Sequence, residues 1–149
     1  MNTNELLKAT GRLNIQIIGP DGAVKDQREV DNLVVTTGLG FIASRMKDAT
    51  ATAMSHMALG SSSATAAAGN TTLGTELGRV ALTSTTVTGN AVAYSASFGP
   101  GVGTGAVTEA GLFNASTGGT MLCRTVFSVV NKDAGDTMAI TWTVTIGAA

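Results

Sequence analysis

The sequence predicts a mostly β protein, an antiparallel β-sandwich or jelly roll with one short α-helix over about residues 38–47. Eight or so short runs of alternating apolar and polar residues are separated by turns rich in Gly, Asn and Pro. No β-α-β alternation appears, which argues against a parallel sheet. The length of 149 residues suits one domain. We expect an N-terminal arm over residues 1–12, disordered or ordered on binding, and a single sandwich over residues 13–149.

The first predicted strand covers residues 13–18, where apolar and polar side chains alternate. The sequence GPDG at residues 19–22 is typical of a turn, because Pro fixes φ and Gly allows a positive φ. A return strand near residues 24–30 would complete a hairpin, and residues 32–37 form another β-rich run. The inward-facing residues of the first strand are expected to be Leu13, Ile15 and Ile17.

The predicted helix covers residues 38–47. Thr37 is expected to cap its N-terminus. Arg45 and Lys47 lie in the last turn, where the helix dipole favours positive charge. The spacing predicts an apolar stripe made of Leu39, Ile42, Ala43 and Met46.

Residues 54–73 begin as a short strand and continue as a long loop rich in Ala, Ser, Thr and Gly. Loops of this length inside a compact domain are usually functional or ordered by a partner. Residues 73–82 lead back into β-structure. We therefore expect residues 60–72 to be a contact loop.

The second half reads almost wholly as strands. Two of them meet at Gly89-Asn90, a two-residue hairpin signal. Residues 99–105 form a Gly-rich turn, and residues 131–136 form a polar loop before the last strand, residues 137–146. One face of each long strand is apolar: Val92, Tyr94, Ala96 and Phe98 in one, and Met138, Ile140, Trp142, Val144 and Ile146 in the other.

The stretch TEAGLFNASTGGTMLCRTVF, residues 108–127, contains residue types that occur in active sites. It also fits a hairpin in which residues 110–113 run in, residues 114–120 turn and residues 121–130 run out. In that arrangement Glu109 and Arg124 are expected to face each other as a pair across the strands.

Each catalytic pattern lacks a partner or the right spacing, so we predict no enzyme and assign no catalytic, cofactor-binding or metal-binding residue. His56 is the only histidine and has no nucleophile elbow beside it in the sequence. Cys123 is the only cysteine and reads as an apolar filler of a strand. Glu76 and Glu109 are isolated from other acids, and ion pairs with Arg79 or Arg124 are favoured over sugar cleavage.

Charge is low and uneven along the chain. Charged residues make up 13% of the sequence and the net charge is −1, which favours neither nucleic acid nor an anionic membrane as a partner. Residues 1–48 hold twelve of the nineteen charged side chains, and residues 49–108 hold only Glu76 and Arg79. The N-terminus lacks the pattern of a signal peptide, so we expect synthesis in a cytosol.

Three stretches resemble structural proteins of tailed bacteriophages. MALGSSSATAAAGNTTLGTELGR, residues 57–79, resembles an "ALG, small-residue loop, LxxE-xx-R" pattern that precedes a hairpin. Residues 108–127 resemble its companion, "E-hydrophobic-GLF-turn-GG-x-L-x-R-x-x-F", and residues 130–146 resemble the polar turn and strand that close the pattern. Together these stretches cover about the last 90 residues, and residues 32–46 fit the usual lead-in.

Among such proteins the short chain is most similar to the jelly-roll capsid cement (decoration) proteins, such as that of short-tailed Bordetella phage. The resemblance implies a homo-oligomer, dimer or trimer, on the outside of the virion capsid, where it clamps neighbouring major capsid subunits. It assigns no contact residues and no cofactor. The alternative is a tail fibre or collar component that acts as a binding module.

Overall fold

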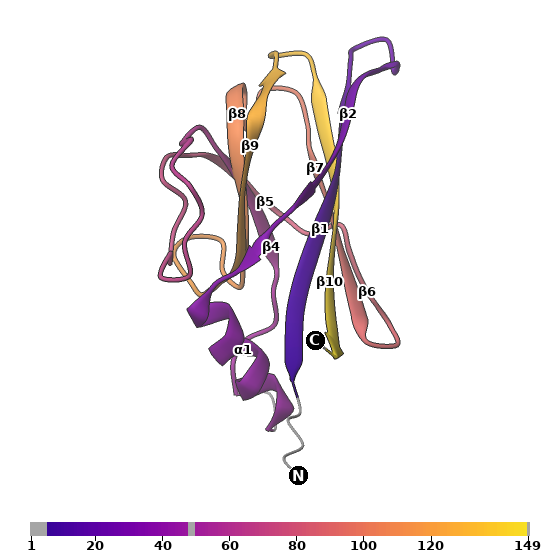
Figure 1. The fold of residues 1–149 in the computed structure, drawn as a ribbon. Helices are drawn as coiled ribbons and strands as arrows, with labels where there is room; N and C mark the ends of the chain where they lie inside the picture. Colours follow the sequence, from indigo (N-terminus) through magenta and orange to yellow (C-terminus); the bar gives the residue numbers. More distant parts are fainter. Residues whose placement is uncertain (1–5, 48–49, 149) are drawn as a thin grey trace.

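The computed structural model describes residues 6–47 and 50–148 (Figure 1). Two five-stranded antiparallel sheets pack face to face, and one helix lies at one end of the sandwich. The elements are β1 (Leu7–Ile18), β2 (Val24–Asp31), β3 (Leu33–Val34), α1 (Thr36–Met46), β4 (His56–Gly60), β5 (Glu76–Ala81), β6 (Ser84–Thr88), β7 (Ala91–Phe98), β8 (Gly105–Phe113), β9 (Met121–Lys132) and β10 (Thr137–Ala148).

Sheet A has the strand order β2-β1-β10-β7-β6, and sheet B has the order β3-β9-β8-β4-β5. Four pairs of consecutive strands are hairpins within one sheet: β1–β2, β4–β5, β6–β7 and β8–β9. The predicted antiparallel sandwich is therefore confirmed. The finer prediction of a jelly roll is not confirmed by this strand order.

One apolar core fills the space between the sheets. Sheet A contributes the predicted inward faces of β1, β7 and β10, and sheet B contributes residues of β4, β8 and β9. Irregular register between β8 and β9 interrupts the alternation in those two strands. In β1, β7 and β10 the alternation in the sequence therefore identifies the side chains that face the core. The fully buried members of this core include Leu13, Ile15, Ile17, Phe98, Trp142, Leu59, Leu112 and Cys123.

The N-terminal part of the sandwich begins earlier than predicted. Residues 7–12, expected in an arm, pair with the end of β10, from Leu7 opposite Ala148 to Arg12 opposite Thr143. Residues 1–5 of the predicted arm lie outside the described residues. The first strand of the sandwich therefore begins at Leu7 rather than at residue 13, because the long last strand supplies backbone partners along one edge of residues 7–12.

The helix differs from its prediction in both its start and its buried face. It begins at Thr36, so the β-rich run expected over residues 32–37 is a strand only at Leu33–Val34. Val35 occupies the N-cap without a side-chain hydrogen bond, and the Thr37 hydroxyl donates instead to the carbonyl oxygen of Met121 at 3.0 Å. The predicted Thr37 cap is therefore wrong.

The buried face of α1 contains Gly38 and Phe41, with Ile42 partly buried. Leu39 and Met46, predicted in the apolar stripe, are 50% and 82% exposed. A Cβ on Gly38 would collide with the carbonyl oxygen of Leu122, so α1 packs closely against the backbone of β9 at this glycine. That close approach fixes the rotation of the helix and overrides its apolar periodicity.

Candidate functional site

The outer face of sheet B is covered by residues 61–75, here called the 61–75 loop (Figure 1). Leu73 of this loop is 6% exposed and packs in a second, smaller apolar cluster on that face. Gly111 of β8 makes room for it, because a Cβ there would lie 3.0 Å from the Leu73 side chain. The other members of the cluster are Val35, Ala58, Phe113 and Met121.

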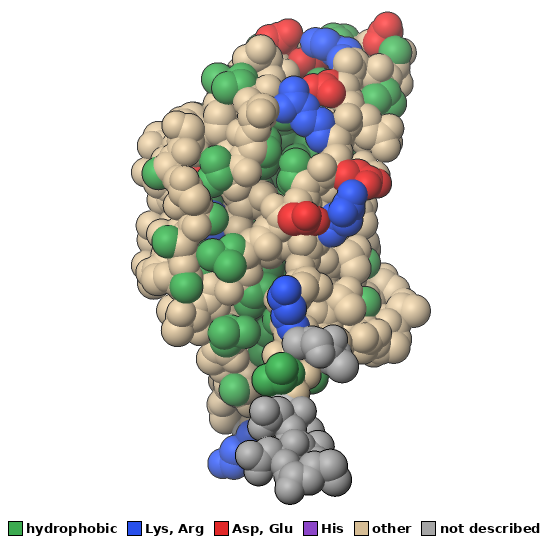
Figure 2. All heavy atoms as spheres, viewed as in Figure 1, with side chains coloured by type: hydrophobic (Ala, Val, Ile, Leu, Met, Phe, Trp, Pro, Cys, Tyr) green, Lys and Arg blue, Asp and Glu red, His purple; other side chains and the backbone are tan. Residues whose placement is uncertain are grey.

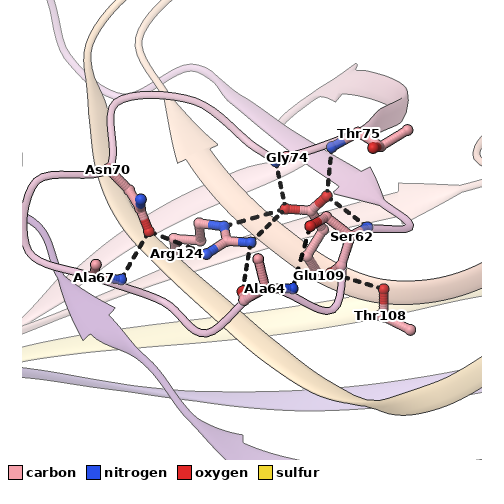
Figure 3. A network of polar contacts seen from close by, with 9 residues as sticks. All are labelled: Ser62, Ala64, Ala67, Asn70, Gly74, Thr75, Thr108, Glu109 and Arg124. Carbon is pink, nitrogen blue, oxygen red and sulfur yellow. Dashed lines mark hydrogen bonds and ion pairs between the residues drawn. The ribbon is translucent and has the colours of Figure 1, made fainter.

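Glu109 of β8 holds both ends of the 61–75 loop (Figure 3). Its carboxylate is fully buried and accepts hydrogen bonds from three loop backbone N–H groups. Ser62 donates at 2.9 Å near the start of the loop, and Gly74 and Thr75 donate at 2.8 Å near its end. One side chain therefore satisfies backbone groups that a loop over a sheet would otherwise bury unpaired.

Arg124 of β9 completes the same network (Figure 3). Its Nε and Nη2 donate to Glu109 Oε1, both at 3.1 Å. Nη2 also donates to the carbonyl oxygen of Ala64, and Nη1 donates to Asn70 Oδ1, both at 3.0 Å. Asn70 Oδ1 in turn accepts the N–H of Ala67 at 2.8 Å. The middle of the loop is thus tied to the same buried charge pair as its ends.

The charge on Glu109 is compensated despite its burial. Burial by itself would raise the pKa of the carboxyl group. The N–H groups of Thr75, Gly74 and Ser62, together with Arg124, outweigh it and hold the pKa below its ordinary value. A buried ion pair tends to cost more in desolvation than it returns unless its remaining hydrogen bonds are made, and here they are made with the loop.

Arg79 of β5 fixes the neighbouring β8–β9 turn. Its guanidinium carbon lies 3.8 Å from the centroid of the Phe113 ring, a cation–π contact. Nη1 donates to the carbonyl oxygens of Ala115 and Gly118, both at 2.9 Å. Glu76 pairs with the same guanidinium at 2.7 Å, as predicted. The outer face of sheet B therefore carries a continuous layer that orders both the loop and the turn.

What the loop presents to solvent is small and uncharged. No Asp, Glu, Lys or Arg occurs between residues 49 and 75. Figure 2 shows the contrast on one face of the molecule: blue and red side chains gather over β1 and β2 and at the upper end, and tan and green atoms cover the loop side. The exposed loop residues are Ser61, Ser63, Ala64, Thr65, Ala67, Ala68, Gly69, Thr71, Thr72, Gly74 and Thr75.

The predicted pairing of Glu109 with Arg124 is confirmed, at 3.1 Å with both side chains buried. They are diagonal neighbours, since Arg124 stands opposite Gly111 and Glu109 stands opposite Val126. The predicted hairpin is also confirmed, with Gly118 and Gly119 at positive φ in the turn. Sequence reasoning missed the loop contacts, because the groups concerned are backbone N–H groups that carry no sequence signal.

His56 and Cys123 lie apart from this network. His56 begins β4 and its Nδ1 is hydrogen-bonded to the Ser55 hydroxyl at 2.8 Å. Cys123 is fully buried in the core between the sheets, and burial raises the pKa of its thiol. A thiol held protonated away from solvent is a poor nucleophile. The structure thus places the two residues as a strand histidine and an apolar core residue.

A second polar cluster lies at the end of the sandwich opposite α1. It joins the start of β2 to the turn between β9 and β10. Lys25 Nζ contacts the carboxylates of Asp136 and Asp133 at 2.9 and 3.3 Å, and the hydrogen bond from Lys25 lowers the pKa of Asp136. The buried Lys132 Nζ donates to the carbonyl oxygens of Gly99 and Asp136 at 2.9 and 2.8 Å, and burial lowers its pKa. These contacts close the β9–β10 turn and were not predicted.

A groove of about 390 Å³ lies between α1 and the strands β6, β7 and β10 of sheet A. It is mainly apolar, and it includes one charged side chain, Arg45. Arg45 also donates to the carbonyl oxygen of Ala51 at 3.1 Å, which ties the end of the helix to the following segment. Other residues of the groove are Phe41, Met54, Val87, Tyr94 and Ile146.

Within residues 6–47 and 50–148, no group of three or more His, Cys, Asp or Glu side chains is placed to hold a metal ion. Over the same residues no helix combines the length and hydropathy needed to cross a membrane. The chain was compared with family models, curated proteins and solved structures. No family model matches, and no curated protein or solved structure matches significantly.

Proposed function

We propose that the protein is a bacteriophage capsid cement protein that binds the outer surface of the head and stabilises contacts between major capsid subunits. One observation supports this most: the residues that carry the phage-like sequence patterns are those that hold the 61–75 loop. The outer layer of sheet B joins one pattern to the other, because Leu73, Glu76 and Arg79 come from the first and Glu109, Gly111, Phe113 and Arg124 come from the second.

The layer suits a contact surface better than a reaction centre. The Glu109 carboxylate and the Arg124 guanidinium are buried, and their hydrogen bonds go to loop and strand groups. The loop they order is exposed and uncharged. A loop that is already ordered loses little conformational entropy on binding. A surface of Ala, Ser, Thr and Gly can also be covered with a small desolvation cost.

A cement protein stabilises an assembly through mass action. If the loop contacts groups brought together only in the assembled shell, the protein binds the shell more tightly than its separate subunits. Each occupied site then shifts the equilibrium toward the assembled state by the free energy of binding. No covalent chemistry is needed for this role.

The first test is the number of copies in purified virions, measured by gel densitometry against the major capsid protein. The proposal predicts hundreds of copies per particle, comparable to the capsid subunit. A few to tens of copies would overturn it and favour the alternative, a tail fibre or collar component. Absence from the virion would contradict both functions.

The second test asks whether the 61–75 loop makes the contact. Phage heads depleted of the protein are mixed with wild-type or variant protein, and bound copies are counted. Ser63→Glu and Thr71→Glu place a charge on exposed loop positions and are expected to reduce occupancy. Gln27→Glu on the charged strand β2 is the matched control and should bind like wild type. Equal binding by all variants would exclude the loop as the contact.

A further inference from the structure

The four edge strands of the two sheets differ in how they are protected against pairing with a strand of another chain. Exposed edges offer unpaired backbone groups, and proteins usually blunt them with charge, shortness or cover. β2 carries Lys25, Asp26, Arg28, Glu29 and Asp31, and β3 has only two residues. β5 carries the paired Glu76 and Arg79, and the Gly101–Gly105 turn lies against its Gly78.

β6 has none of these protections. Its sequence is STTVT, and all five residues are exposed. No charged residue occurs between Arg79 and Glu109, so the whole β6–β7 hairpin is uncharged. The hairpin is nevertheless held in place, because Asn90 in its turn donates to the carbonyl oxygen of Ile146 at 2.7 Å and accepts the N–H of Ile146 at 3.0 Å. Over residues 6–47 and 50–148 no strand pairs with the outer side of β6, which is therefore an ordered, uncharged edge strand.

We propose that β6 pairs with β6 of a second copy of this chain, so that two copies of sheet A become one continuous antiparallel sheet. An uncharged edge strand is matched by another uncharged edge strand, and β6 of a second copy of this chain is such a strand. Thr and Val also favour strand pairing through their branched side chains. This dimer does not depend on whether the 61–75 loop binds a capsid.

The register of the hairpin fixes how the two copies would meet. The two-residue turn makes Thr88 and Ala91 a hydrogen-bonded pair, and hydrogen-bonded and non-bonded pairs then alternate along β6 and β7. The outward-facing N–H and C=O groups are consequently those of Thr85 and Val87. A two-fold axis at Thr86 pairs Thr85 of each copy with Val87 of the other, which satisfies these groups.

The apolar groove described above supports the same arrangement. Thr85 and Val87 line it, on the inner face of sheet A opposite Tyr94 and Val92. Val87 is 70% exposed, a large value for a side chain beside an apolar groove. Because the two-fold axis runs perpendicular to the sheet, both grooves would lie on one side, and the Val87 side chain of each copy would be covered.

The proposal is tested by sedimentation velocity on the full-length protein over about 1–100 µM, the range that reveals a micromolar dimer. Wild type is expected to dimerise. Thr86→Lys and Thr86→Glu each place like charges opposite one another on the axis and should weaken the dimer by about tenfold or more. An equimolar mixture of the two should restore it as a heterodimer. The far-UV spectrum and Trp142 fluorescence confirm that each variant is folded.

Val24→Lys, at a 53% exposed position on the opposite edge, is the matched control and should dimerise like wild type. A wild-type monomer at every concentration would overturn the proposal. So would a dimer that Thr86→Lys leaves intact, a mixture that stays monomeric, or an equal loss caused by Val24→Lys.

Discussion

Glu109 is the single residue on which the order of the 61–75 loop most depends. Changing it to Gln keeps the shape but leaves the buried Arg124 without its counter-charge. With the amide nitrogen in place of Oε2, the variant also loses the acceptor of the Ser62 and Thr75 N–H groups. Breaking a buried ion pair in this way is expected to lower the free energy of unfolding by about 3–5 kcal/mol. Urea unfolding followed by Trp142 fluorescence measures the change.

Glu29→Gln is the matched control, because it removes the same charge from an exposed pair. Glu29 and Arg12 are 2.7 Å apart, with side chains 53% and 60% exposed. Solvent screening makes the contribution of such an exposed pair to stability small. A similar loss in the two variants would show that the Glu109 network contributes no more than a surface contact.

The lowered pKa values of Glu109 and Asp136 make stability depend on pH. Their stabilising contribution is fully present above the ordinary carboxyl values, 4.5 and 3.8. Below these values the unfolded chain takes up protons before the folded one, so stability falls as pH falls toward the lower folded pKa values. We expect the free energy of unfolding to decrease from pH 5 downward, and less steeply in Glu109→Gln. Equal slopes for the variant and wild type would contradict this account of Glu109.

At the scale of the secondary-structure elements, two glycines of α1 are expected to change the stability of the protein in opposite directions when each is replaced by Ala. Ala is the better helix former by about 1 kcal/mol, so Gly40→Ala, with no atom within 4 Å of the new Cβ, should stabilise the protein. Gly38→Ala should destabilise it by about 1–3 kcal/mol, because its Cβ would collide with the Leu122 carbonyl group. Thermal unfolding of the two variants measures both signs. Stabilisation by both would show that the helix can move away from β9.

The same helix shows where sequence reasoning stops. Strands such as β10 could be predicted residue by residue, because alternation records which side faces the core. The helix could be located but not oriented, since Leu39 and Met46 match the apolar period as well as Phe41 does. Its orientation depends on the Gly38–Leu122 contact. A close approach of two backbones cannot be recognised from the spacing of apolar residues in the sequence.

The Glu109–Arg124 pair could be predicted, in contrast, because residue types in the sequence mark the turn between its two strands. Gly118 and Gly119 mark the turn of a hairpin, and a hairpin brings side chains of its two strands close together. The contacts of Ser62, Gly74 and Thr75 with Glu109 join residues 34 to 47 positions apart through backbone N–H groups. Every non-proline residue has such a group, so the residue types at these positions do not indicate the contact.

At the scale of the whole molecule, the two sheets share one core, and neither buries its inner face without the other. Trp142 of β10 in sheet A and Cys123 of β9 in sheet B are both fully buried in this cluster. They are the only tryptophan and the only cysteine of the chain. Each sheet therefore carries a unique internal reporter of its unfolding.

If the sheets unfold as one cooperative unit, the two reporters must respond together. Trp142 fluorescence and the reactivity of Cys123 toward a pulse of thiol reagent are expected to give the same urea midpoint. Glu109→Gln should lower both midpoints equally, although only Cys123 lies in the sheet that carries Glu109. Cys123 that reacts at urea concentrations where Trp142 fluorescence is still native would show that sheet B opens alone. The shared core would then be too weak to couple the loop-bearing sheet to the sheet that carries the β6 edge.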